Sequence, residues 1–186
     1  MTTSILLICR ANLCRSPAAE VLLSVALDAD HVAGEVHSAG VEAVVGQVAP
    51  PPFVEAALSR GIDLRDRAPI AYVPEMGSRS DLVLTMTRDL LRTMVVNQPS
   101  LWPRSFTLLE LVRRGVSLEP PEPSDTLAGW IGRVHASRDR SELLGANAID
   151  DVRDPMAAAE EDAATMFEQL ETATRRLSRL LAVLSG

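Results

Sequence analysis

Long hydrophobic runs are missing from this chain, and cysteines are few. The N-terminal apolar stretch covers about five residues and lacks a basic flank, so it resembles neither a signal peptide nor a membrane span. With only Cys9 and Cys14, the 186 residues do not have the cysteine content of a disulfide scaffold. We therefore expect a cytoplasmic protein that does not bind a membrane.

Lysine is absent, and aromatic residues make up only 3% of the chain. All 18 basic residues are arginine, and the formal net charge of −7 argues against a nucleic-acid partner. The three histidines (His31, His37 and His135) lie too far apart in sequence for metal-ligand spacing. The chain is 47% hydrophobic and shows no composition shift or repeat, which predicts one domain over residues 1–186. The oligomeric state has no signal in the sequence.

Segments typical of strands alternate with segments typical of helices. This order predicts an α/β fold, a three-layer α/β/α arrangement with a doubly wound parallel sheet. Residues 117–148 give the weakest pattern, with one irregular helix expected within 125–144. The expected strands are 4–9, 36–39, 81–86 and 105–109, and the expected helices are 16–28, 53–60, 88–96 and a C-terminal helix with an apolar stripe from Met166 to Leu184.

Residues 9–16, with the sequence CRANLCRS, join the first strand to the first helix and carry most of the functional information. Pro17 is suited to the first turn of a helix, where its missing N–H costs nothing. A strand-to-helix loop of this kind directs backbone N–H groups and a helix N-terminus at one point, which favours an anion. The octet therefore predicts a phosphate-binding loop between strand 1 and helix 1.

The side chains of this loop match the chemistry of phosphoryl transfer. A helix N-terminus and a nearby arginine favour the thiolate of Cys9, the nucleophilic form of cysteine. Arg15 offers a planar fork for two oxygens of a phosphate-like dianion. Asn12 tolerates unusual backbone angles and can bond across the loop, and Ser16 can donate a hydrogen bond to the sulfur. The phosphate-binding residues expected from this loop are Arg10, Ala11, Asn12, Leu13, Cys14, Arg15 and Ser16. The alternative is a buried Cys9 and a solvated Arg15.

This octet resembles the signature loop of the low-molecular-weight protein tyrosine phosphatases. Other segments resemble further parts of that family's sequence, in the same order: Ser38-Ala39-Gly40, Arg60-Gly61-Ile62-Asp63, the strand at 81–86 and Asp154-Pro155. The resemblance implies a four-stranded parallel sheet flanked by helices. It also implies hydrolysis of phosphate monoesters through a cysteinyl-phosphate intermediate, without metal or cofactor. The expected partner is a phosphorylated protein or a small phosphoester.

The resemblance assigns roles to individual residues. Cys9 is the expected nucleophile, Arg15 the phosphate ligand and Asp154 the general acid and base. From the residues alone, Asp154 is an ordinary helix cap before proline, and Asp150 and Asp151 are rivals for the acid.

Two further residues receive supporting roles from the resemblance. Ser38 is expected to bond Asn12 and so to support the loop. Cys14 is a possible redox partner of Cys9, since a cysteine at the matching place forms a reversible disulfide with the nucleophile in the family. An equally good interpretation is that Cys14 is a small buried side chain without a redox role.

The chain also departs from the family pattern. Ala11 stands where glycine is usual, and a histidine that fixes the loop in some relatives is replaced near Asp66. Met156 follows Asp154-Pro155, and residues 41–48 contain no aromatic residue, so the aromatic walls of phosphotyrosine-preferring relatives are missing. Leu13 is bulky and apolar where phosphoarginine-cleaving relatives carry a small polar residue. These differences argue against a strong phosphotyrosine preference and against phosphoarginine.

Two other functions fit the loop. Arsenate has the geometry of phosphate, so an arsenate reductase resolved by a low-molecular-weight thiol needs only Cys9. The thioredoxin-coupled version requires further cysteines downstream, and none follows Cys14. A non-catalytic phosphate-binding module is the second alternative, but it has no use for both Cys9 and Asp154.

Overall fold

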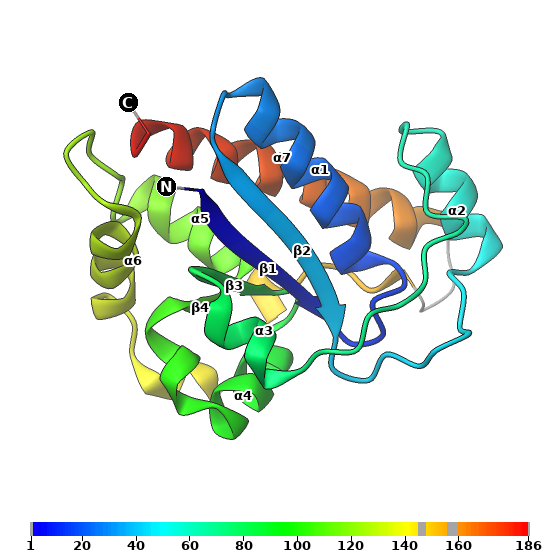
Figure 1. Ribbon diagram of the computed structural model, residues 1–186, viewed down its shortest axis with the longest axis horizontal. Coiled ribbons are helices and arrows are strands. Elements are labelled where there is room, and N and C mark those ends of the chain that lie inside the picture. Colours follow the sequence, from blue (N-terminus) through cyan, green and yellow to red (C-terminus); the bar gives the residue numbers. More distant parts are fainter. Residues whose placement is uncertain (1, 145–147, 156–159, 186) are drawn as a thin grey trace.

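Four parallel strands form the centre of the molecule, in the order β2-β1-β3-β4 (Figure 1). The computed structural model describes residues 2–144, 148–155 and 160–185. The strands are β1 (Thr3–Cys9), β2 (Gly34–Gly40), β3 (Leu82–Thr85) and β4 (Ser105–Thr107). β1 pairs in parallel with both β2 and β3, and its last five residues are buried. The predicted doubly wound sheet is confirmed.

Helices cover both faces of this sheet and complete three layers. The α-helices are α1 (Arg15–Ala29), α2 (Pro51–Leu58), α3 (Pro74–Arg79), α4 (Arg88–Asn97), α5 (Leu108–Ser117), α6 (Leu127–Ala136) and α7 (Glu160–Val183). The 3₁₀ turns are η1 (Pro99–Arg104), η2 (Arg140–Leu143) and η3 (Ala148–Asp150).

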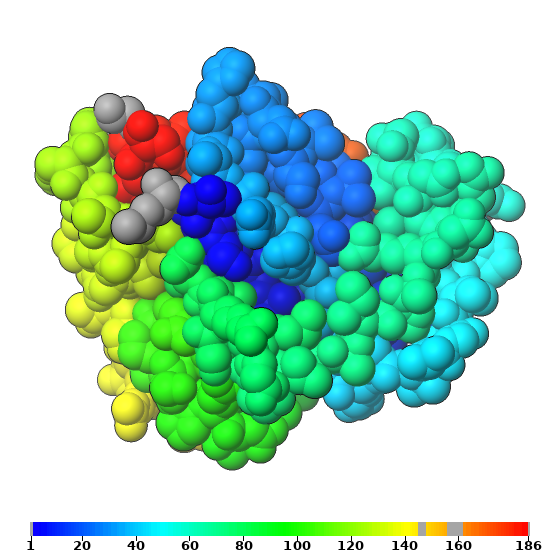
Figure 2. All heavy atoms as spheres, in the orientation of Figure 1, coloured from blue at the N-terminus to red at the C-terminus, as the bar shows by residue number. Residues whose placement is uncertain are grey.

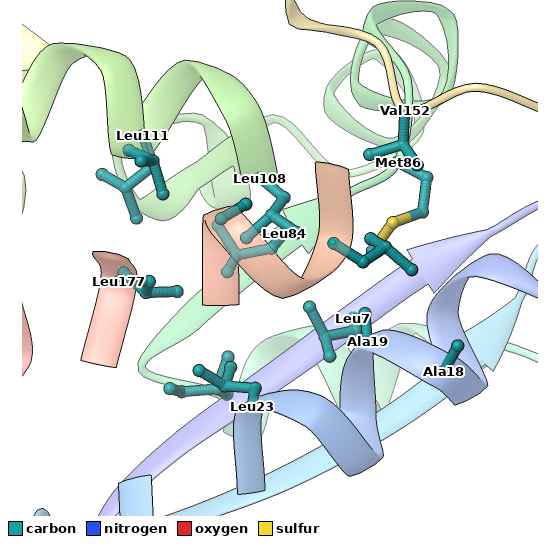
Figure 3. Close-up of a cluster of buried hydrophobic side chains, with 14 of the residues drawn as sticks. Leu7, Ala18, Ala19, Leu23, Leu84, Met86, Leu108, Leu111, Val152 and Leu177 are labelled. Atoms are coloured by element: carbon teal, nitrogen blue, oxygen red, sulfur yellow. The ribbon is translucent and has the colours of Figure 1, made fainter. Parts of the chain in front are cut away.

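The alternation of side chains along β1 divides the core between the two faces. Ile5 and Leu7 belong to a large cluster that includes residues of α1, α5 and α7. Leu6 and Ile8 belong to a smaller cluster with Met94 of α4. Figure 3 shows Leu7 of the larger cluster between Ala19 on α1 and Leu84 on β3. On the face with the smaller cluster, the blue atoms of β1 and β2 are visible beside the green residues of α3 and α4 in the space-filling view (Figure 2).

The C-terminal helix α7 closes the larger face. Its Phe167 stacks on Phe53 of α2, with ring centroids 5.3 Å apart. The Ser178 hydroxyl donates to the Ala26 carbonyl of α1 at 2.9 Å, which ties the last helix to the first. The stripe predicted for this helix is buried at Met166, Leu170, Ala173 and Leu177, as the periodicity requires.

The chain between residues 105 and 144 differs from the sequence prediction. The fourth strand ends at Thr107 rather than at residue 109, because the Thr107 side chain accepts the Glu110 N–H and begins α5, which the prediction missed. The irregular helix expected within 125–144 is present, but it is divided into two parts. Two elements occupy this range, α6 and the turn η2, each starting at its own side-chain cap (Thr126 and Asp139).

The described helices also bear on the membrane question. Among residues 2–144, 148–155 and 160–185, no helix combines the length and the apolar character that crossing a bilayer requires.

The packing of α5 against α6 and α7 leads to a stability prediction. A Cβ at Gly115 would lie 2.8 Å from a ring carbon of Trp130 and 2.9 Å from Leu180. Overpacking of this kind costs about 1–3 kcal/mol, partly offset by the better helix propensity of alanine. We expect Gly115→Ala to lower the free energy of unfolding by about 1–2 kcal/mol in urea titration.

Gly132 in α6 provides the matched control, because a Cβ there meets no atom within 4 Å. Gly132→Ala should raise stability by about 0.5–1 kcal/mol through helix propensity alone. Equal stability changes at the two glycines would contradict the packing described for Gly115.

Candidate active site

Cys9 ends β1 at the carboxyl edge of the sheet, where parallel α/β sheets bind ligands. Its sulfur accepts a hydrogen bond from the Asn12 backbone N–H at 3.2 Å and another from the Ser16 hydroxyl at 3.0 Å. The residue is 2% exposed. The loop and the start of α1 therefore surround the sulfur with donors, an environment that stabilises a thiolate.

Asn12 gives the loop its shape. Its φ of 55° lies in the left-handed region, which asparagine tolerates better than most residues. The side-chain amide donates to Ser16 at 3.0 Å and to Ser38 at 2.8 Å, and its oxygen accepts the Ile70 backbone N–H at 2.8 Å. One buried side chain thus joins the loop to α1, to β2 and to the segment before α3.

A second layer of contacts supports Ser38. Arg67 donates to the Ser38 hydroxyl at 3.1 Å and forms an ion pair with Glu20 of α1. Arg67 follows Asp66, near the place where some relatives carry a histidine that fixes the loop. Its hydrogen bond to Ser38 thus supports the loop from this region. Sequence reasoning did not select Arg67 or Glu20, because residues 47 positions apart in sequence meet only in the folded chain.

Gly40 at the end of β2 lets the loop approach the sheet. A Cβ there would lie 2.7 Å from the Arg10 carbonyl and 2.7 Å from the Asn12 nitrogen, closer than packed atoms come. Beside it, the backbone N–H groups of Val41 and Glu42 donate to the carbonyls of Cys9 and Arg10. Only glycine leaves room for this contact, which is a physical reason for the glycine at position 40.

Asp154 reaches the loop from the far end of the chain. Its carboxylate lies 2.9 Å from a terminal nitrogen of Arg15, whose side chain is 9% exposed. The segment before it is attached to the sheet where the Val152 N–H donates to the Met86 carbonyl at 2.8 Å. Figure 3 shows the Val152 and Met86 side chains next to each other. The structure therefore brings Cys9, Arg15 and Asp154 to one edge of the sheet.

The two rival carboxylates are engaged elsewhere. Asp150 is 1% exposed and pairs with Arg88 and Arg113. Asp151 accepts the backbone N–H of Arg88 at 2.7 Å. Asp154, by contrast, pairs with Arg15 of the loop.

A cleft of about 500 Å³ opens beside Arg15 and Asp154. The walls carry charges of both signs, together with the apolar residues Leu90, Ala148 and Val152. The lining residues are Arg10, Arg15, Thr87, Asp89, Leu90, Ala148, Asp151, Val152, Arg153, Asp154 and Gln169. None of the chain's aromatic residues is among them, and all three phenylalanines and both tryptophans are buried in the core. Met156, which directly follows Asp154-Pro155 (the acid loop), lies outside the described residues.

Cys14 lies within the loop and is 4% exposed, and both cysteines are free thiols. Burial, together with the nearby charge of Cys9, raises the pKa of the Cys14 thiol to about 12. Cys14 therefore stays a neutral thiol at physiological pH. Leu13 is partly buried and packs against the larger core cluster.

Arg10 and Ala11 complete the loop. The Arg10 guanidinium pairs with Glu42 at 2.6 Å on the rim of the cleft. Ala11 stands within the loop backbone that contacts Gly40, and the loop closes without the glycine usual in the family. Among the described side chains, no group of three histidine, cysteine or acidic residues is arranged to hold a metal ion.

The family model for low molecular weight phosphotyrosine protein phosphatase matches residues 4–126. The chain belongs to this family. The match includes the loop and ends before the acid loop, so the placement of Asp154 rests on the structure alone.

Individual relatives agree with this assignment. The probable low molecular weight protein-tyrosine-phosphatase EpsP of Ralstonia solanacearum is 34% identical over 111 residues, which are 60% of this chain and 74% of that protein. The solved low molecular weight protein tyrosine phosphatase of T. tengcongensis has a TM-score of 0.68 at 26% identity, covering 95% of this chain and 97% of that one. The YwlE arginine phosphatase of Geobacillus stearothermophilus shares the fold, with a TM-score of 0.67, 24% identity and coverage of 95% and 91%.

The ion pair between Arg15 and Asp154 predicts competition with a bound anion. Phosphate must replace the carboxylate on the Arg15 guanidinium and must also overcome its negative charge. A partly exposed pair of this kind contributes up to about 1 kcal/mol, or roughly fivefold in affinity. We expect Asp154→Asn to bind inorganic phosphate about fivefold more tightly in calorimetric titration.

Asp89→Asn is the control, because Asp89 lines the same cleft and lies 4.0 Å from Arg10 rather than next to Arg15. It removes the same charge and should change phosphate affinity less. Weaker phosphate binding by Asp154→Asn would show that the pair does not compete with the anion.

Proposed function

We propose that this phosphatase-family protein hydrolyses phosphate monoesters through a phosphocysteine on Cys9. In the first step the Cys9 thiolate attacks phosphorus, the ester P–O bond breaks, and the Asp154 carboxylic acid protonates the departing oxygen. In the second step the Asp154 carboxylate takes a proton from water, the water oxygen attacks phosphorus, and the S–P bond breaks. Inorganic phosphate leaves and the thiolate is restored.

The other loop residues hold charge during both steps. Arg15 offers its fork to two phosphate oxygens, and the backbone N–H groups of residues 10–15 are proposed to bind the others. The Ser16 hydroxyl, 3.0 Å from the sulfur, stabilises the thiolate when it leaves in the second step. The side chains of Asn12 and Ser38 support the loop backbone and are proposed not to contact the substrate.

The single observation that carries this proposal is the 2.9 Å contact between Arg15 and Asp154, which are 139 positions apart in sequence. An anion-binding loop alone fits a binding module as well as an enzyme. A carboxylate placed on the phosphate-binding arginine supplies the group that protonates an ester leaving oxygen. This favours hydrolysis over a non-catalytic module, and over arsenate reduction, which needs no such acid.

We propose a phosphorylated protein as the substrate, in keeping with relatives named protein-tyrosine-phosphatases. Phosphotyrosine is expected to be accepted with a high KM, because no aromatic residue is among those lining the cleft. Stacking between aromatic groups adds about 0.5–1.5 kcal/mol per pair, which this cleft does not supply.

We further propose that residues 1–186 act as a single domain, since the last helix, α7, packs on the first helix, α1. A cytoplasmic location is supported by the nucleophile, which must stay reduced, and by the two free thiols. Cys14 as a redox partner of Cys9 stays a proposal. Its high pKa makes the neutral thiol the resting form.

The mechanism predicts a graded loss of activity toward 4-nitrophenyl phosphate. Cys9→Ser should abolish turnover, since a serine hydroxyl is a much weaker nucleophile in a site built for a thiolate. Asp154→Asn should lower kcat/KM by about 10²–10⁴-fold, the usual contribution of a positioned acid. Steady-state assays of the purified proteins measure both effects.

Asp151→Asn serves as the control for a neighbouring carboxylate and should keep most of the activity. Equal activity of wild type, Cys9→Ser and Asp154→Asn would remove the mechanism. Failure of the wild type to turn over the ester, with arsenate-dependent consumption of a thiol, would favour the reductase.

Leu13 provides a test of substrate selection. Its apolar side chain is proposed to disfavour the charged guanidinium of phosphoarginine, since burial of a charge against an apolar group is costly. Leu13→Thr should raise the ratio of phosphoarginine to phosphotyrosine hydrolysis by roughly tenfold, about 1.4 kcal/mol. An unchanged ratio in a paired assay of both substrates would contradict the role given to Leu13.

A further inference from the structure

Asp150 is a buried carboxylate that the proposed mechanism does not use. Its side chain is 1% exposed and accepts three hydrogen bonds from two guanidinium groups. Arg113 donates twice, at 2.9 and 2.8 Å, and Arg88 donates at 3.0 Å. A buried charge held this way has one allowed position, because moving it leaves unpaired charges in a medium of low dielectric constant.

The two arginines belong to rigid elements on either side of the carboxyl edge. Arg88 is the first residue of α4, and Arg113 lies within α5. Arg88 also donates to the Glu142 carbonyl, so the same side chain holds the turn η2 in place. Asp150 is therefore attached to two helices at once, with little freedom to shift.

Three further hydrogen bonds transmit this position to the acid loop. The Asp150 carbonyl accepts the Thr107 hydroxyl at 2.8 Å, the Asp151 carboxylate accepts the Arg88 N–H at 2.7 Å, and the Val152 N–H donates to Met86. Three consecutive residues are thus bonded to the ends of β3, β4 and α4. Asp154 follows two residues later.

We propose that Asp150 is a positioning residue for the general acid, acting through Arg88 and Arg113 to keep Asp154 over the phosphate loop. The inference rests on the proposed function, since it assigns a partner to the acid of that mechanism. A displacement of about 1 Å in a catalytic group can cost as much as 10²-fold in rate, so an anchor four residues away affects chemistry without touching substrate.

The test is a series of aryl phosphates whose phenols differ in acidity, assayed by kcat/KM. This parameter covers the transfer of the phosphoryl group to Cys9 and the departure of the phenol. A poor leaving group depends on a placed acid, while an acidic phenol leaves without one. Loss of Asp154 should therefore steepen the dependence of log(kcat/KM) on phenol acidity.

Asp150→Asn should reproduce this signature in weaker form. We expect kcat/KM to fall about 10-fold for phenyl phosphate and about twofold for the ester of the most acidic phenol. Arg113→Gln removes two of the three hydrogen bonds that Asp150 accepts. It should lower kcat/KM for phenyl phosphate about threefold. Arg113 is 42% exposed, so this variant decides the question if Asp150→Asn does not fold.

The chain offers a matched control in Asp125 and Arg133, another bidentate pair, at 2.6 and 2.7 Å, whose arginine is 40% exposed. Asp125→Asn and Arg133→Gln should leave the slope of the series unchanged. A uniform loss across all esters in both Asp150→Asn and Arg113→Gln would overturn the positioning role. If Asp154→Asn itself shows no steeper slope, the proposed mechanism fails rather than the role of Asp150.

Discussion

The hydrogen bonds of one buried asparagine hold the site together. Asn12 adopts a left-handed backbone conformation and uses its side chain to join the loop to Ser16, Ser38 and the Ile70 backbone. Each of these partners belongs to a different part of the chain. Since the amide is buried, an unsatisfied donor or acceptor there would cost about 1–3 kcal/mol, so the loop has one strongly preferred shape. The geometry of the donors around Cys9 follows from that shape.

Two different kinds of contact bring the proposed reacting groups to the same edge of the sheet. The proposed nucleophile is placed by local chain geometry, because Cys9 ends the central strand and Arg15 begins the next helix. The proposed acid, Asp154, is placed by long-range contacts, in which residues 150–152 are bonded to the ends of β3, β4 and α4. The first kind is compact in sequence. The second depends on arginines, whose planar forks suit bidentate pairing with carboxylates, in a chain that contains no lysine.

Prediction from sequence succeeded where the pattern is local and repetitive. The apolar run before Cys9 and the alternation of strands with helices were enough for the parallel sheet, and the apolar stripe from Met166 defined the last helix. It failed where a strand changes directly into a helix. Thr107 is both the last strand residue and the cap of α5, so the apolar residues after it resemble a continuation of the strand. Residues 117–148 have no clear apolar period in the sequence. Within them, η2 is held by contacts with distant residues, such as the ion pair of Glu142 with Arg114 of α5.

The sequence by itself determined the chemical groups of the loop, because the thiol, the guanidinium and the donors between them lie within eight consecutive residues that join β1 to α1. It also determined the lack of aromatic walls, since a chain with so few aromatic residues uses them in its core. The resemblance selected Asp154 through the Asp154-Pro155 pair, but only the tertiary structure placed this aspartate beside the loop. Asp150 and Asp151, its rivals from the residues alone, are held by Arg88 and Arg113, whereas Asp154 pairs with Arg15. These contacts join distant segments of the chain, so no local pattern in the sequence encodes them.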